Sequence, residues 1–138
     1  EEYARQMRLR HSFAKVAGVT FPNDDGSERQ QIIRRCTAGE HLILRHDAYN
    51  AYSIYAIQVL RANGEQIGHV PDYLAERIYE EAEAQYLISA ILVEVTGGTW
   101  DKPSCGVNFV VFFVAKEVSN ADYQQYVSNV LAERSGWF

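Results

Sequence analysis

Two long apolar runs, at residues 84–96 and 106–116, constrain the fold of this chain more than any other feature. Ile, Leu, Val and Phe occur in them at the density of buried strands, and Gly97-Gly98 ends the first run. The segment between the runs contains Trp100 and a proline and has the character of a loop. The runs therefore predict two long strands that pair with each other.

Four shorter segments also have strand character, because they alternate apolar and polar residues or are rich in β-branched residues. Gly18, inside the first of them, predicts a bulge or a bend. Asn63-Gly64 predicts a type I′ turn before the last of them, because this pair supplies positive φ at both central positions. The four segments are residues 13–21, 41–45, 54–60 and 66–70.

Helical patterns occupy much of the remaining chain. Ser27 is a candidate N-cap for one helix, and Pro71 is a candidate first residue for a second. Ser119 is a candidate N-cap for a terminal helix at 119–134, and residues 1–11 have the composition of a helical lead-in. Because strands and helices do not alternate regularly, the pattern favours an α+β fold built around an antiparallel barrel or a tightly curled sheet.

Length and composition fit one globular domain spanning residues 1–138, with 47% apolar and 22% charged residues. No apolar run reaches the roughly 18 residues that a membrane span needs, and the N-terminus lacks the apolar segment of a signal peptide. We therefore expect no membrane partner. Cys36 and Cys105 form no Cys-x-x-Cys pair, which indicates two reduced thiols in an intracellular protein, cytoplasmic or nuclear.

The sequence contains none of the motifs that would mark an enzyme. Phosphate-binding loops, dinucleotide fingerprints, nucleophile elbows and zinc-protease motifs are all absent. His41 and His46 face opposite sides of a strand at 41–45, so the histidines do not have the spacing of metal ligands. Cys36 follows two arginines but shares a helix face with apolar residues, which does not favour a nucleophile. We expect no catalytic residue, no metal and no cofactor.

The net charge is −5, but the charges are unevenly distributed. Residues 1–61 contain nine Lys/Arg against seven Asp/Glu, whereas residues 62–138 contain four against eleven. The first half can therefore present a basic face within an acidic protein. From counting alone, an ordinary solvated surface accounts for this distribution equally well.

The most informative segment runs from Leu42 to Val59 and continues through 63–75. It combines a strand, a polar elbow with Asn-x-Tyr at residues 50–52, an Ala-Ile-x-Val strand and an Ile-Gly-His return strand that enters a helix. This arrangement resembles the HIRAN domain family, most closely over residues 13–80. The resemblance implies an OB-like six-stranded barrel with two core helices, so 1–11 and 119–134 are expected to be helical additions.

The resemblance also implies a function. HIRAN domains occur in helicase-like transcription factors, DNA-repair translocases and stand-alone bacterial proteins, and their best understood members bind a 3′ end of single-stranded DNA in a pocket at the elbow. Tyr faces can stack on bases, Asn can bind a base edge or sugar hydroxyl, and Arg or His can neutralise phosphate. The candidate nucleic-acid-binding residues are Lys15, Arg45, His46, Asn50, Tyr52, Ser53 and His69.

Three positions depart from the family pattern. Ser53 stands where end-binding members carry an acidic residue, and Asp72 stands where they carry a basic one. Lys15-Val16 replaces an aromatic pair. We therefore expect a non-catalytic module that binds single-stranded DNA or a DNA end, within a larger DNA-processing protein or alone, without strong preference for a free 3′ end.

Two alternatives remain open from the sequence. Asn50 can shape the elbow by hydrogen bonding to the backbone while Tyr52 closes the mouth of the barrel. The whole chain can also be a protein-interaction domain that docks through the barrel or the helix at 119–134. Salt separates these functions, because binding through phosphate contacts weakens steeply with salt.

Overall fold

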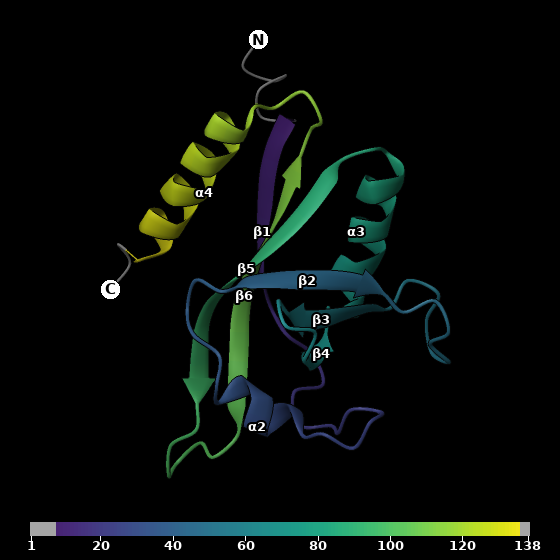
Figure 1. Cartoon of the computed structure of the whole chain (residues 1–138), viewed down its shortest axis with the longest axis vertical. Coiled ribbons are helices and arrows are strands. Elements are labelled where there is room, and N and C mark those ends of the chain that lie inside the picture. Colours follow the sequence, from purple (N-terminus) through teal and green to yellow (C-terminus); the bar gives the residue numbers. More distant parts are fainter. Residues whose placement is uncertain (1–7, 136–138) are drawn as a thin grey trace.

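The computed structural model describes residues 8–135 and contains one six-stranded antiparallel sheet in the order β1-β6-β5-β2-β3-β4 (Figure 1). The sheet curls strongly, which confirms the prediction of an α+β, OB-like fold. The strands are β1 (Leu9–Lys15), β2 (His41–His46), β3 (Ile57–Arg61), β4 (Gln66–His69), β5 (Leu87–Gly97) and β6 (Cys105–Val114); the helices are α2 (Arg29–Ile33), α3 (Asp72–Glu83) and α4 (Asn120–Ser135).

One backbone bridge brings the two ends of the sheet together. Ala17, just after β1, donates to the carbonyl of His69 in β4 at 2.7 Å, and the His69 N–H returns a bond to Ala17 at 2.9 Å. Gly18 follows with φ of +70°, so the chain bends there as predicted. The sheet is therefore nearly closed, because a single residue after β1 pairs with a single residue of β4.

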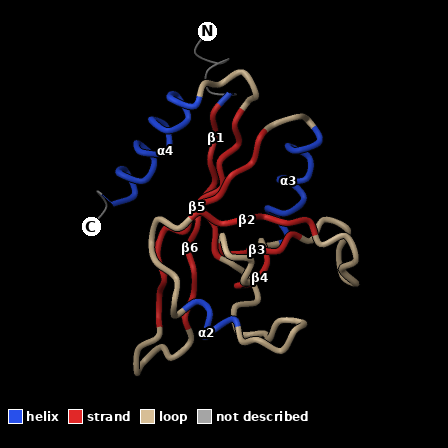
Figure 2. Tube along the Cα trace, in the orientation of Figure 1, coloured by secondary structure: helices blue, strands red, loops and turns tan. Residues whose placement is uncertain are grey.

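The two long apolar runs form β5 and β6, which pair from Leu87↔Val114 to Gly97↔Cys105. β6 is buried on both faces, which explains why its sequence is apolar without alternation. Its odd-numbered residues, including Phe109 and Phe113, enter the core enclosed by the curled sheet, α2 and α3. The residues between them, such as Phe112, pack with Val127 and Val130 of α4. Figure 2 shows α4 lying alongside the sheet.

The terminal helix is as predicted. Ser119 accepts a hydrogen bond from the Asp122 N–H at 3.1 Å and so caps α4. The face with Tyr123 and Tyr126 packs onto the sheet. Within the part of the chain that the structure describes, neither α4 nor any other helix has the length and apolar character to cross a bilayer.

The helical lead-in predicted at residues 1–11 is wrong for residues 9–11, although Arg8 is helical. Residues 1–7 lie outside the described part, but Leu9–Lys15 is strand β1, which pairs along β6 from Leu9↔Val114 to Lys15↔Asn108. A free edge of β6 offers ladder hydrogen bonds and apolar contacts that outweigh a weak local helix propensity. The strand predicted at 13–21 accordingly starts earlier and ends at Lys15.

Two local signals were also misinterpreted. Ser27 does not cap α2: its hydroxyl donates to Asp25, and the N-cap residue, Glu28, makes no side-chain cap. At the Asn63-Gly64 turn only the glycine has positive φ, at +94°, so a type I′ turn is wrong. The Asn63 side chain instead accepts the Glu65 N–H at 3.0 Å, which holds the turn without a left-handed residue at 63.

Candidate nucleic-acid interface

The elbow between β2 and β3 is held together by Asn50. Its side-chain oxygen accepts the N–H groups of Tyr52 at 2.8 Å and of Ser53 at 3.1 Å, and its amide donates to the Asp47 carboxylate at 3.2 Å. The Ser53 hydroxyl in turn accepts the Tyr55 N–H at 3.1 Å. Asn50 and Ser53 thus shape the elbow, and β3 begins at Ile57 rather than at 54 because the intervening residues belong to this turn.

The elbow presents two tyrosines to solvent. Tyr49 and Tyr52 are each 98% exposed, so Tyr52 does not close the mouth of the barrel. Two fully exposed aromatic side chains on one short turn form a candidate contact surface. Each tyrosine ring can stack against a base of the ligand on either of its two faces.

A row of polar side chains crosses the sheet beside the elbow. The strand register pairs Arg45 with Gln58 and Gln58 with His69, so the three residues lie on the same face of β2, β3 and β4. Two guanidinium nitrogens of Arg45, Nε and Nη2, donate to Gln58 Oε1 at 2.9 and 2.6 Å. Gln58 was missed from the sequence; only the strand register could have identified it.

His69 joins this row to the elbow. Its Nε2 lies 3.5 Å from Asp47 Oδ2, which is an ion-pair distance but not a hydrogen bond, and this shielded nitrogen has no hydrogen-bond partner within residues 8–135. Asp47 also receives the amide of Asn50. The imidazole therefore has an unused polar atom beside the carboxylate that organises the elbow.

The structure separates two candidates from this group. His46 lies on the opposite face of β2 from Arg45, where its Nε2 is 2.6 Å from the Ile54 carbonyl and its ring lies 5.6 Å from that of Tyr79. Lys15, at the end of β1, lines a different groove. The candidate residues brought together around the elbow are Arg45, Asn50, Tyr52, Ser53 and His69.

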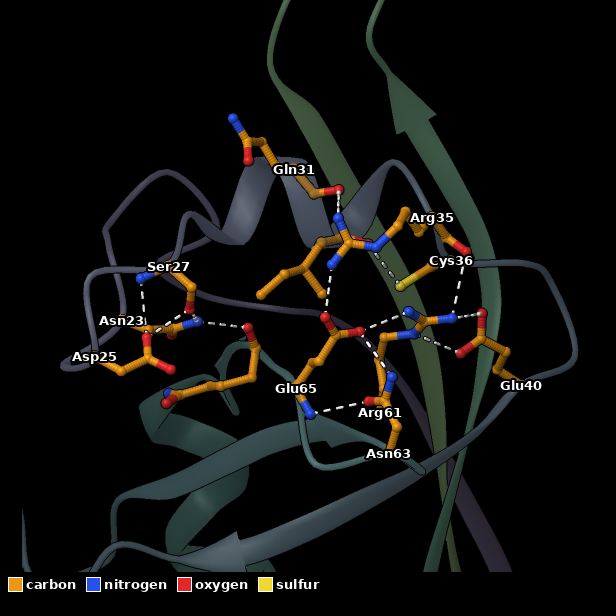
Figure 3. A network of polar contacts seen from close by, with 12 residues as sticks. Asn23, Asp25, Ser27, Gln31, Arg35, Cys36, Glu40, Arg61, Asn63 and Glu65 are labelled. Carbon is orange, nitrogen blue, oxygen red and sulfur yellow. Dashed lines mark hydrogen bonds and ion pairs between the residues drawn. The ribbon is translucent and has the colours of Figure 1, made fainter.

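Several arginines of the basic first half bind partners within the domain (Figure 3). Arg61 donates to Glu40 at 3.0 Å and to Glu65 at 2.8 Å, and Arg35 binds Glu65 at 2.6 Å. Hydrogen bonds from Asn63, Arg35 and Arg61 hold the pKa of Glu65 below its usual value. The positive excess of residues 1–61 therefore does not form one continuous basic face.

Among the described residues, Cys36 and the possible metal ligands are the groups to consider for chemistry. Burial raises the pKa of Cys36 to about 11, so its thiol is protonated at neutral pH and is a poor nucleophile. Residues 8–135 bring together no group of three or more His, Cys, Asp or Glu side chains that could hold a metal ion.

A small, strongly curled antiparallel sheet with a polar elbow and two core helices defines an OB-like domain. The family model described as "HIRAN domain" matches residues 9–115, and the chain belongs to the HIRAN domain family. No curated protein matches the chain.

Solved structures show the same fold. The HIRAN domain of human HLTF is 19% identical, with a TM-score of 0.56 over 87% of this chain and 91% of that chain. A protein from Lactobacillus plantarum is 12% identical, with a TM-score of 0.58 over 76% of this chain and 96% of that one.

Proposed function

We propose that this domain is a non-catalytic nucleic-acid-binding module whose ligand is single-stranded DNA or a DNA end. The observation that carries the proposal is the elbow itself: two solvent-exposed tyrosines on a turn held by Asn50, beside the row formed by Arg45, Gln58 and His69. Membership of the HIRAN domain family, whose relatives bind DNA, supports it.

Each part of the elbow has a role in such binding. Tyr49 and Tyr52 are stacking platforms for successive bases. Arg45 contacts a phosphate, and Gln58 orients its guanidinium through two hydrogen bonds. His69 completes the polar row against which a phosphate or sugar would lie, with its shielded Nε2 3.5 Å from Asp47 Oδ2.

The elbow does not favour specific capture of a free 3′ end. Ser53, at the position of the acidic residue in end-binding relatives, uses its hydroxyl oxygen within the turn, to accept the Tyr55 N–H. We expect that blocking the 3′ end changes affinity by less than about threefold, which is under about 0.7 kcal/mol. A strong preference for free 3′ ends would show that another group, such as Asp47, binds the hydroxyl.

A titration with fluorescent single-stranded oligonucleotides at two salt concentrations tests the proposal. Arg45→Ala should weaken binding and reduce the salt slope by about 0.7 for one lost phosphate contact. Tyr52→Ala should cost roughly 1 to 3 kcal/mol with the slope nearly unchanged, because stacking involves no counterion release. Oligonucleotides with free and blocked 3′ ends belong in the same titration.

Two residues outside the elbow supply controls. Trp100→Ala removes an exposed aromatic ring from the β5–β6 loop, and Arg8→Gln removes a charge paired with Glu117. Both should leave binding unchanged. If Arg45→Ala and Tyr52→Ala also leave it unchanged, or if no binding is detected at low salt, the proposal is wrong. ATPase activity or chelator-sensitive nuclease activity of the pure protein would contradict its non-catalytic part.

A second candidate function, protein interaction, is favoured by the divergence of β2 and β5. These strands pair only at His41↔Ile91 and Leu42↔Ala90, and beyond this point they enclose a mainly apolar groove with Tyr79 of α3. An exposed strand edge beside apolar side chains suits an extended peptide. Binding to a partner protein that is nearly indifferent to salt, together with no binding to oligonucleotides, would select this function.

A further inference from the structure

Two grooves border the proposed interface and offer two routes for a bound strand. The first, with a volume of about 600 Å³, lies between the 23–28 loop and the β3–β4 hairpin and includes Arg45. The second, with a volume of about 680 Å³, lies between β1 and α4 and includes Lys15. A strand longer than the elbow must follow one of them or leave the surface.

Charge distinguishes the two grooves. The first is lined by two arginines and by four carboxylates, those of Asp24, Asp25, Glu28 and Glu65. The second is lined by Lys15 and Arg134 against the single carboxylate of Glu133. Glu94, which pairs with Arg134, adds a second carboxylate beside this groove. A phosphate backbone is therefore repelled from the first groove and meets less negative charge in the second.

The second groove also has the aromatic surfaces that unpaired bases need. Phe13 on β1 is 39% exposed and Tyr73 in the first turn of α3 is 72% exposed, and both line the groove. The guanidinium carbon of Arg134 lies 5.6 Å from the centre of the Phe13 ring. Grooves that bind single strands usually combine aromatic side chains, on which bases stack, with positively charged side chains that contact phosphates.

The groove starts where the elbow row ends. Pro71, which lines it, is two residues beyond His69, and Lys15 is two residues before Ala17, the backbone partner of His69. The hydrogen-bonded pair of Ala17 and His69 therefore lies between the polar row at the elbow and the groove.

Arg134 is held in place rather than free in solvent. Its Nη2 lies 3.5 Å from Glu94 Oε1, and the same oxygen accepts the Asn108 amide at 2.7 Å. Arg134 belongs to α4, which follows the residues 9–115 matched by the family model. This wall of the groove lies outside the residues that the family model matches.

From this placement we propose that α4 and β1 extend the binding surface, so that a single strand leaves the elbow through their groove. Phe13 and Tyr73 stack on its bases, and Lys15 and Arg134 contact its phosphates. The inference rests on the proposed function at the elbow and adds the path and length of the bound strand.

The path of the bound strand is tested by comparing the affinities of a short and a long oligonucleotide for the whole chain. A strand of about 4 nucleotides covers the elbow alone, whereas one of about 12 reaches the groove, within the 4 to 16 nucleotides that OB folds bind. The long strand should bind more tightly. Tyr73→Ala should weaken the long strand by about tenfold, as expected for one lost stacking contact, and the short strand by less than twofold.

Arg134→Gln should reduce the salt slope of the long strand by about 0.7 without changing that of the short one. Arg8→Gln is the matched control: it removes the same charge at the opposite end of β1 and α4, outside the groove, and should change neither strand. Phe13→Ala repeats the stacking test from the other wall, and its folding is checked by thermal unfolding.

The outcomes separate this inference from the function it rests on. If short and long strands bind with equal affinity, the path through the groove is wrong, although binding at the elbow stands. The same holds if the groove variants lose equal affinity for both strands. Binding of neither strand overturns the proposed function. Loss of the long-strand advantage in Tyr73→Ala and Arg134→Gln, but not in Arg8→Gln, supports the inference.

Discussion

At the residue scale, Asn50 shows that a binding candidate can act by organising its neighbours. Its side chain makes three hydrogen bonds within the elbow, to Asp47, Tyr52 and Ser53. Turn formation and ligand binding are therefore not alternatives for this residue. The turn that Asn50 holds is what fixes the exposed Tyr52 beside the row of Arg45 and His69.

Asn50→Ala should weaken oligonucleotide binding by about as much as Tyr52→Ala does, because the tyrosine loses its fixed position. The free energy of unfolding should fall by roughly 1 to 3 kcal/mol, because three hydrogen bonds of about 1 kcal/mol each are lost. Urea denaturation and binding titration measure the two effects. Asn63→Ala removes two hydrogen bonds to Glu65, away from the elbow, and should lower stability without loss of binding; weaker binding in this control would count against the role of Asn50.

His11 gives the domain a pH-dependent stability. Burial lowers the pKa of His11, which lies with Nδ1 at 2.6 Å from the Tyr126 hydroxyl. The folded state therefore binds this proton less readily than the unfolded chain, so stability is complete above the unfolded pKa of about 6.5 and declines as pH falls below it. Carboxylates with lowered pKa values, such as that of Glu81, act only at lower pH.

Urea denaturation at about pH 7.5 and about pH 5.5, on either side of the unfolded histidine pKa, checks this expectation. The wild-type chain should lose more stability between the two pH values than His11→Gln, whose side chain does not titrate. The difference between the two proteins isolates His11 from the other histidines. An equal loss in both would show that His11 does not contribute.

At the element scale, β6 and α4 show how a strand comes to be apolar on both faces. Successive residues of β6, such as Phe112 and Phe113, belong to different cores. Helix α4 covers the core that contains Phe112. Two hydroxyl contacts fix α4 on the sheet: Tyr123 lies 2.6 Å from Ser89 Oγ, and Tyr126 lies against His11. The helix is thus an integral part of the sheet's packing.

Ser119→Ala should destabilise the domain by about 1 kcal/mol, because the Asp122 N–H at the start of α4 loses its acceptor. Thermal or urea unfolding measures the loss. Ser119→Asp keeps an acceptor at the N-cap and should retain most of the stability. If the aspartate variant is as unstable as the alanine variant, the cap is not the cause.

At the scale of the whole molecule, closure of the sheet depends on Gly68. A Cβ atom at this position would lie 2.4 Å from the carbonyl oxygen of Ala17 and 2.5 Å from a methyl carbon of Val16. The contact between Ala17 and β4 thus requires a residue without a side chain. The same contact joins the elbow row to the groove between β1 and α4.

Gly68→Ala should destabilise the domain by about 1 to 3 kcal/mol or more, as for overpacking in a core, and should reduce binding of long oligonucleotides. Gly64→Ala is the control, because it has positive φ but nothing within 4 Å of the added carbon. It should cost only roughly 1 to 2 kcal/mol of backbone strain and leave binding intact. Equal effects of both substitutions on binding would refute the role of closure.

Local sequence patterns were sufficient to predict several features of this protein: the pairing of β5 with β6, the Ser119-capped α4, the bend at Gly18 and the HIRAN resemblance around the elbow. Each depends on the order of residues within one short segment, where periodicity and turn chemistry act directly. Tertiary structure decided the rest. Leu9–Lys15 became a strand because β6 offered it an edge, and Gln58 joined Arg45 and His69 through strand register. The tertiary structure also placed His46 against the Ile54 carbonyl and the Tyr79 ring, and α4 placed Arg134 against Phe13. These outcomes depend on contacts between residues distant in the chain, whose energies exceed local propensity and leave no local pattern in the sequence.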